Sequence, residues 1–258
     1  MHSQAARAAV LGCALLMAAA PSVCADDAPL TLARVYKPGT TYRYRIDAAA
    51  IVMGSDVVVE RTIKLTVKEM KPNGDAVLLH TDEGGKVNVG GQEQETGAGG
   101  PVTMIKDKLG RVVKLTHDAS DLSFMPPEAE HLLAIASEWL PPSKAVRAGD
   151  AWRSEIDNPA VKGRKLVVKT TLVGAEKVQG ADAYRIRQAV DADTDEQGGK
   201  MRSEFTMLVD PTTGAELAME GKVKGLPTQY GPLDMSVKLR ALKPDDKAPG
   251  PEATPPAS

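Results

Sequence analysis

The sequence predicts a mainly β protein made of two related antiparallel halves that are joined by one amphipathic helix. Three observations support this fold class. Apolar and polar residues alternate with a period of two along most of the chain, which is the pattern of half-buried strands. One stretch recurs at an offset of 110 residues, and a segment with helical spacing lies between the two copies. Because turn residues separate the strands at short intervals, each half is expected to be a meander that forms a curved sheet, a half-barrel or a sandwich.

In chain order the sequence divides into five segments. Residues 1–25 are predicted to be a signal peptide, and 26–117 the first β-rich repeat. Residues 118–146 are a connector that contains the helix, and 147–243 are the second β-rich repeat. The tail, 244–258, is rich in proline and charged residues, a composition that predicts disorder.

The first segment has the pattern of an export signal. Arg7 precedes the apolar stretch Ala8–Ala20, which is too short to span a bilayer, and small residues flank Cys24. Cys13 and Cys24 both lie in this segment, so the mature chain is expected to have no thiol for disulfides, catalysis or metal binding. A lipid anchor at Cys24 is the alternative to simple cleavage. Either way, the predicted location is the periplasm or the exterior of a bacterial cell.

The internal repeat aligns Lys37–Asp47 with Arg147–Asp157 without a gap. A second correspondence aligns 104–110 with 208–214, each an apolar strand end followed by Asp and a turn Gly. The alternation places the shared aromatic and Ile on a buried strand face, so the repeat predicts scaffold rather than chemistry. The matched residues are Gly39 and Gly149, Tyr42 and Trp152, Arg43 and Arg153, Ile46 and Ile156, and Asp47 and Asp157.

The predicted strands each have one apolar face. Lys71–Asp75 and Asp210–Gly214 each carry Pro followed by Gly, a pattern that favours tight turns between such strands. The apolar positions are Tyr42, Tyr44 and Ile46; Ile63, Leu65 and Val67; Leu166, Val168 and Leu172; Tyr184 and Ile186; Phe205, Met207 and Val209; and Met235, Val237 and Leu239.

Two segments depart from this alternation. Glu83–Gly100 is rich in Gly, Gln and Glu, and it is predicted to be a long flexible loop with a short strand at Lys86–Val89. Pro127–Leu140 has the i, i+3, i+4, i+7, i+8 spacing of an amphipathic helix, with Pro at its start and Pro141-Pro142 after it. The apolar residues of this helix are Leu132, Ile135, Ala136, Trp139 and Leu140.

Charge and composition exclude several classes of partner. The formal net charge is −2 with both signs well mixed, and aromatic residues make up 3% of the chain. A nucleic-acid-binding surface is therefore not expected, because it would need a basic patch or a set of stacking aromatics. Apart from the export signal, the sequence contains no stretch that is long and apolar enough to span a membrane as a helix.

Candidate catalytic and metal sites are weak. His80, His117 and His131 stand without a Gly-x-Ser-x-Gly elbow or HExxH spacing, and they are interpreted as ordinary histidines. The acidic cluster Asp191–Glu196 fails the EF-hand pattern, because Glu196 and Arg202 stand where Gly and Glu are required. It is predicted to be a solvated hairpin loop. We therefore expect no catalytic residues, no metal site and no cofactor, and the sequence leaves the ligand-binding residues unknown.

Motifs in the second half carry a family resemblance. Pro141–Trp152, then Gly180 and Tyr184, then Val209–Gly214 resemble a family of secreted bacterial β-proteins of unknown function. More weakly, the segment from Val173 onward is similar to the periplasmic lipoprotein-carrier superfamily. That resemblance implies a curved antiparallel sheet with helices against its concave face, and the binding of acyl chains.

Three functional hypotheses remain. The leading one is a non-enzymatic envelope protein that binds a hydrophobic ligand, such as a lipid, or another envelope component. It predicts an apolar cavity lined by residues such as Leu132, Trp139 and Phe205. The second is a protein-interaction or structural module without a small ligand, and the third is a hydrolase with an unrecognised site. The first places to look for a site are Glu83–Gly100, Asp191–Glu196 and the connecting helix.

Overall fold

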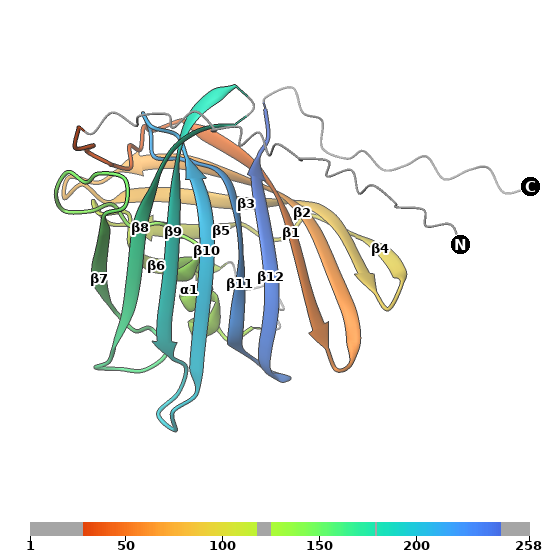
Figure 1. The fold of residues 1–258 in the computed structure, drawn as a ribbon. Coiled ribbons are helices and arrows are strands. Elements are labelled where there is room, and N and C mark those ends of the chain that lie inside the picture. The colour runs from red at the N-terminus through yellow and green to blue at the C-terminus, as the bar shows by residue number, and fades with distance from the viewer. Residues whose placement is uncertain (1–27, 118–124, 179, 244–258) are drawn as a thin grey trace, which may run out of the picture.

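A computed structural model of the chain describes residues 28–117, 125–178 and 180–243. The predicted export signal, the alternative lipid anchor at Cys24 and the predicted disordered tail lie outside these residues. The described residues form a mainly β fold with one helix, as the sequence predicts (Figure 1). The elements are β1 (Thr41–Val52), β2 (Ser55–Met70), β3 (Ala76–Val89), β4 (Gln92–Thr96), β5 (Val102–Lys106), β6 (Val112–His117), α1 (Pro127–Ala136), β7 (Ala151–Asp157), β8 (Lys165–Val178), β9 (Ala181–Asp193), β10 (Lys200–Val209), β11 (Glu216–Thr228) and β12 (Gly231–Ala241).

All the described strands belong to one antiparallel sheet. Its order is β6-β5-β3-β2-β1-β12-β11-β10-β9-β8-β7, and β4 pairs with β3 beside this path. The strands that precede α1 in the chain lie next to one another in the sheet, and so do the strands that follow α1. β1 pairs with β12, so the two halves share one continuous sheet. The sheet is open at β6 and β7, and it curves around α1 (Figure 1).

The two segments that the repeat aligns form the same turn. The Gly39 N–H donates to the Val67 carbonyl over 2.8 Å, and the Gly149 N–H donates to the Leu172 carbonyl over 2.7 Å. Both glycines have positive φ, at 84° and 89°, a conformation that only glycine adopts without strain. Each turn introduces the first strand of its half. Whether the halves arose by duplication stays a prediction.

In the segment Glu83–Gly100, the predicted short strand Lys86–Val89 is the end of β3, but most of the rest is strand and turn instead of the long flexible loop that the sequence predicts. β3 continues through it, and Gly90 and Gly91 turn the chain into β4. Within β3, Gly85 lies so close to β2 that a Cβ would collide with the Glu60 carbonyl, which explains why glycine stands there. The long loop was predicted because β4 is almost wholly exposed and the adjoining end of β3 is half-buried at most positions, so no apolar alternation marks these residues as strands.

The helix begins where it is predicted to begin and ends earlier. Pro127 opens α1, and the first turn is acidic, which suits the positive end of the helix dipole. The helix ends at Ala136, because the chain then leaves the helical path and places Trp139 in the core as an irregular segment. The side-chain amide of Gln188, on β9, donates to the carbonyls of Ala136 and Glu138 over 3.0 and 2.8 Å, and so binds this helix end to the sheet.

Candidate functional site

The concave face of the sheet is covered unequally. α1 packs against β6, β9 and β11, and the inward residues of the second half are buried beneath it. Leu132 and Trp139 are fully buried and Phe205 nearly so. Their side chains therefore fill a core instead of lining a ligand cavity, and the cavity expected at these residues is not there. Gly221 contributes to this packing, because the Phe205 ring occupies the space where its Cβ would be.

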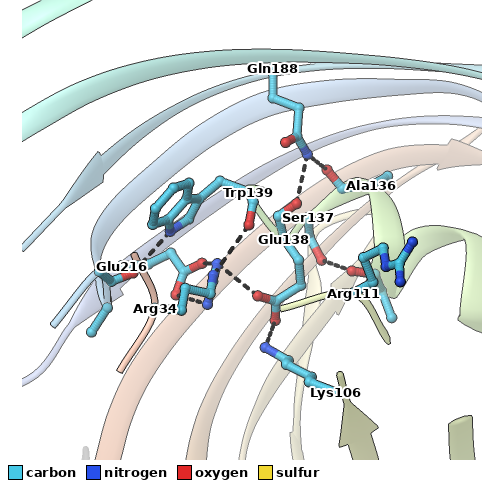
Figure 2. Close-up of polar contacts among 12 residues, drawn as sticks. Arg34, Lys106, Arg111, Ala136, Ser137, Glu138, Trp139, Gln188 and Glu216 are labelled. Atoms are coloured by element: carbon cyan, nitrogen blue, oxygen red, sulfur yellow. Dashed lines mark hydrogen bonds and ion pairs between the residues drawn. The ribbon is translucent and has the colours of Figure 1, made fainter. Parts of the chain in front are cut away.

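A buried polar network closes one end of the concave face (Figure 2). Arg34, from the segment before β1, forms ion pairs with Glu138 over 2.8 Å and with Glu216. Lys106 forms an ion pair with the other oxygen of Glu138 over 2.5 Å. The Arg34 Nε also donates to the Trp139 carbonyl over 3.2 Å. Two cations thus meet two carboxylates out of water, so the cluster has no net charge.

The surroundings separate the two carboxyl groups in pKa. Burial opposes ionisation of Glu138, but Lys106 and Arg34 more than offset it and hold the pKa of Glu138 below its ordinary value. Burial raises the pKa of Glu216, and the nearby charge of Glu138 adds to this effect beyond what Arg34 compensates. The difference has a simple cause: Glu138 contacts two cations and Glu216 contacts one. Glu216 is therefore the first of the two to take up a proton as the pH falls.

The network fastens the connector onto the sheet. The Trp139 indole N–H donates to the Gly214 carbonyl over 2.9 Å, and the Trp152 indole N–H donates to the Leu140 carbonyl over 2.8 Å. The Arg34 guanidinium lies 5.2 Å from the centre of the Trp139 ring, within the range of a cation–π contact. Because its charged groups form ion pairs with one another, we interpret the network as structural. We call it the lock, since it fixes the connector segment around Glu138 and Trp139 to the sheet.

An apolar groove lies at the opposite end of the sheet, where β1 and β12 separate. Their pairing ends at Ala50 and Met235, although both strands continue. Pro232 has no N–H to donate across the gap. The groove between the strands has a volume of about 360 Å³, near the lower limit for ligand pockets. Its walls carry no charged residue, and they include Ala48, Ala50, Val52, Val57, Val59, Tyr230, Pro232, Leu233 and Met235.

The groove continues onto a half-buried part of the concave face. Ala48, Ala50 and Val52 point inward from β1 and pack against the edge of the main core, yet each stays partly exposed. The next inward positions, Val57 and Val59 on β2, are also partly exposed. The inward face of β8 to β10 is buried in contrast. An apolar surface is therefore left open beside a closed core.

The three histidines lie apart from the groove, in the first half and on α1. His80 is in β3, and its buried Nε2 has no hydrogen-bond partner. His117 ends β6 and lies 2.6 Å from a carboxylate oxygen of Glu130 on α1. His131 contacts the Val112 carbonyl over 3.1 Å. The described residues contain no group of three or more His, Cys, Asp or Glu side chains placed to hold a metal ion.

The acidic cluster forms the end of the β9–β10 hairpin. Asp193 pairs with Arg164 over 2.7 Å and with Lys200. Asp195 accepts a hydrogen bond from the Gly199 N–H over 2.8 Å. These carboxylates stabilise the turn. Asp191–Asp193 are the last residues of β9, so only the second half of the predicted hairpin loop lies in the turn.

Burial of His80 gives a testable pH dependence. Burial lowers the pKa of His80, and the nearby His117 adds to this, while Asp82 opposes it. The unfolded chain therefore binds a proton at a higher pH than the folded chain does. Stability from this source is present above the ordinary histidine pKa and is lost as the pH falls below it. We expect the urea midpoint to fall from pH 7.5 to 5.5, and to fall less in His80→Leu. An equal fall in both would contradict this account.

Comparisons with known proteins do not assign a family. No protein-family model matches the chain, and no curated protein matches it significantly. Among solved structures it is similar to an outer membrane lipoprotein-sorting protein domain from Vibrio parahaemolyticus, at 11% identity and a TM-score of 0.21. That alignment covers 79% of this chain and 83% of the other. An overlap this low carries no conclusion about fold or function. Within the described residues, no helix is long and apolar enough to cross a membrane.

Proposed function

We propose that this is an exported envelope protein that binds an apolar ligand of the acyl- or alkyl-chain class, without catalysing a reaction. The observation that carries the proposal is the uncharged groove between β1 and β12, which continues onto a partly exposed apolar face. The export pattern of residues 1–25 supports a periplasmic or secreted location.

The chemistry of the groove favours a hydrocarbon chain. Ala48 and Ala50 are small, so they leave room between strands where larger inward residues would fill it. Each methylene transferred from water to such a surface contributes about 0.8 kcal/mol. A ligand with a long apolar chain therefore gains most from the site, and its polar head can stay in solvent at the rim.

Filling the groove is expected to weaken ligand binding. Ala50→Trp places a large ring between β1 and β12, and the Kd for a dansyl-labelled undecanoic acid should rise at least about tenfold, the change expected when roughly 1.4 kcal/mol is lost. Fluorescence titration of the chain from residue 26, which retains every described residue, measures this. Ala189→Trp is the control, because Ala189 lies on β9 between the buried residues Gln188 and Val190, points to the convex face and does not line the groove.

Two outcomes would contradict the proposal. One is an unchanged Kd in Ala50→Trp. The other is saturable binding that neither variant alters, which would place the probe elsewhere on the chain. Far-ultraviolet circular dichroism and the urea midpoint of each variant show whether the fold is retained.

A further inference from the structure

The β1–β2 hairpin extends beyond the sheet that holds it. β12 pairs with β1 only as far as Ala50, and β3 pairs with β2 only from Val57 onward. Between these positions the two strands pair with each other alone, through Ile51 with Asp56 and Val52 with Ser55. One backbone hydrogen bond, from the Gly90 N–H to the Asp56 carbonyl, supports the base. The tip therefore projects from the rim beside the groove.

Apart from the exposed residues Ser55 and Asp56, this tip carries apolar side chains on both faces and at its end. Val52 points to the concave side, whereas Ile51, which is 65% exposed, points to the convex side. Val58 is also exposed on the convex side, and Met53 at the turn is 85% exposed. From residue 48 to 59 the sequence has one charged residue, Asp56. Soluble hairpins normally keep one face polar, so this arrangement needs another explanation.

The turn itself departs from ordinary turn chemistry. Met53 has φ of 50° and Gly54 has φ of 82°, so both central residues are left-handed, as in a type I′ turn. Asn or Gly is favoured at the first of these positions. Met53 is the single non-glycine residue with positive φ among those described. Its side chain is too exposed to gain packing that would offset the strain, which points to a contact outside the chain.

The neighbouring tip supplies an interfacial side chain. Tyr230, in the β11–β12 turn, is 60% exposed and borders the groove. Tyrosine beside aliphatic residues is typical of the level where lipid headgroups meet acyl chains, because its ring is apolar and its hydroxyl is polar. The mouth of the groove lies between the two tips.

We infer that the β1–β2 hairpin inserts into the outer layer of a lipid bilayer, with Met53 leading and Tyr230 at the headgroup level. A protein partner would cover one face of the hairpin, whereas a fluid hydrocarbon layer can surround both faces and the tip at once. The inference deepens the proposed function, because a groove that opens at the bilayer surface can exchange an acyl chain with the membrane. It names the lipid bilayer as the partner of this surface.

Flotation of the chain from residue 26 with dioleoylphosphatidylcholine vesicles tests the inference. The unaltered chain should float with the vesicles, and Met53→Asn should lower the partition coefficient about tenfold, as expected for losing one buried apolar side chain. The same substitution suits the turn, so its Tm should rise by a few degrees instead of falling. Loss of binding with a gain in stability cannot come from unfolding.

Two further variants isolate the cause. Leu109→Asn alters an exposed apolar residue in the β5–β6 turn, at the other end of the sheet, and should leave flotation unchanged. Val58→Asp should reduce flotation but keep the affinity for the dansyl probe in vesicle-free buffer, because Val58 faces away from the groove. No flotation of the unaltered chain, or equal flotation of Met53→Asn, would overturn the inference. Loss of probe binding with intact flotation in Ala50→Trp would show that the groove and the membrane-binding hairpin act separately.

Discussion

Arg34→Met is expected to lower the free energy of unfolding by about 3–5 kcal/mol, the usual cost of removing one partner from a buried ion-pair network. Glu216 would keep no cation, and Glu138 would keep only Lys106. Both carboxylates would remain in the interior, where an uncompensated charge is costly. Equilibrium unfolding in urea at pH 7 measures the loss. Arg153→Met is the matched control, because Arg153 forms its ion pair on the exposed surface and such pairs contribute little.

A double-mutant cycle separates the ion pair from the other contacts of Arg34. If Glu216→Gln is combined with Arg34→Met, the buried charge that lost its partner is removed. The double variant should then be more stable than the sum of the single losses predicts, by about 1–3 kcal/mol. Strict additivity would show that Arg34 acts through its contacts with Glu138 and Trp139 and not through Glu216.

Most strands were predictable because one face of each is more exposed to solvent and the other is buried or half-buried. Ile63, Leu65 and Val67 alternate with polar residues, and the structure places them on the concave side of β2. The β3–β4 hairpin was predicted only at Lys86–Val89, because β4 is exposed and the end of β3 is half-buried at most positions, so burial leaves no period in the sequence. Alternation of apolar and polar residues shows which face of a strand is buried, and it is absent where neither face is buried.

The network and the groove were not predictable for a different reason. Arg34, Lys106, Glu138 and Glu216 are far apart in the chain, and only the sheet order brings them together. The groove depends on where β1 and β12 stop pairing, a property of register that no single segment contains. One signal was present: the run from residue 48 to 59 is apolar at both odd and even positions, which a strand with one wet face does not require.

The two ends of the concave face therefore have different roles in the fold. At one end the lock around Arg34 holds the connector against the second half, and the core there is filled. At the other end the concave face lacks such a cover, and the apolar groove is left open. The filled core at the first end can thus hold the fold together, and no ligand is needed in the groove at the other end to complete the core.

Trp139→Ala tests this division directly. Trp139 is fully buried, and its ring lies against Gly214 in the main core, so truncation should cost about 3–5 kcal/mol of unfolding free energy. It also removes the hydrogen bond to the Gly214 carbonyl. Trp152→Ala, which alters a partly exposed tryptophan on β7, should cost less.

The affinity for the dansyl probe decides the functional part of this prediction. Because the groove lies at the opposite end of the sheet from Gly214, the Kd of folded Trp139→Ala should stay within about twofold of the unaltered chain, since distant sites act independently. A large rise in Kd would instead place the ligand beneath α1, where Leu132 and Phe205 lie. A large loss of stability together with an unchanged Kd would show that the core around Trp139 supports the fold and that the groove between β1 and β12 binds the ligand.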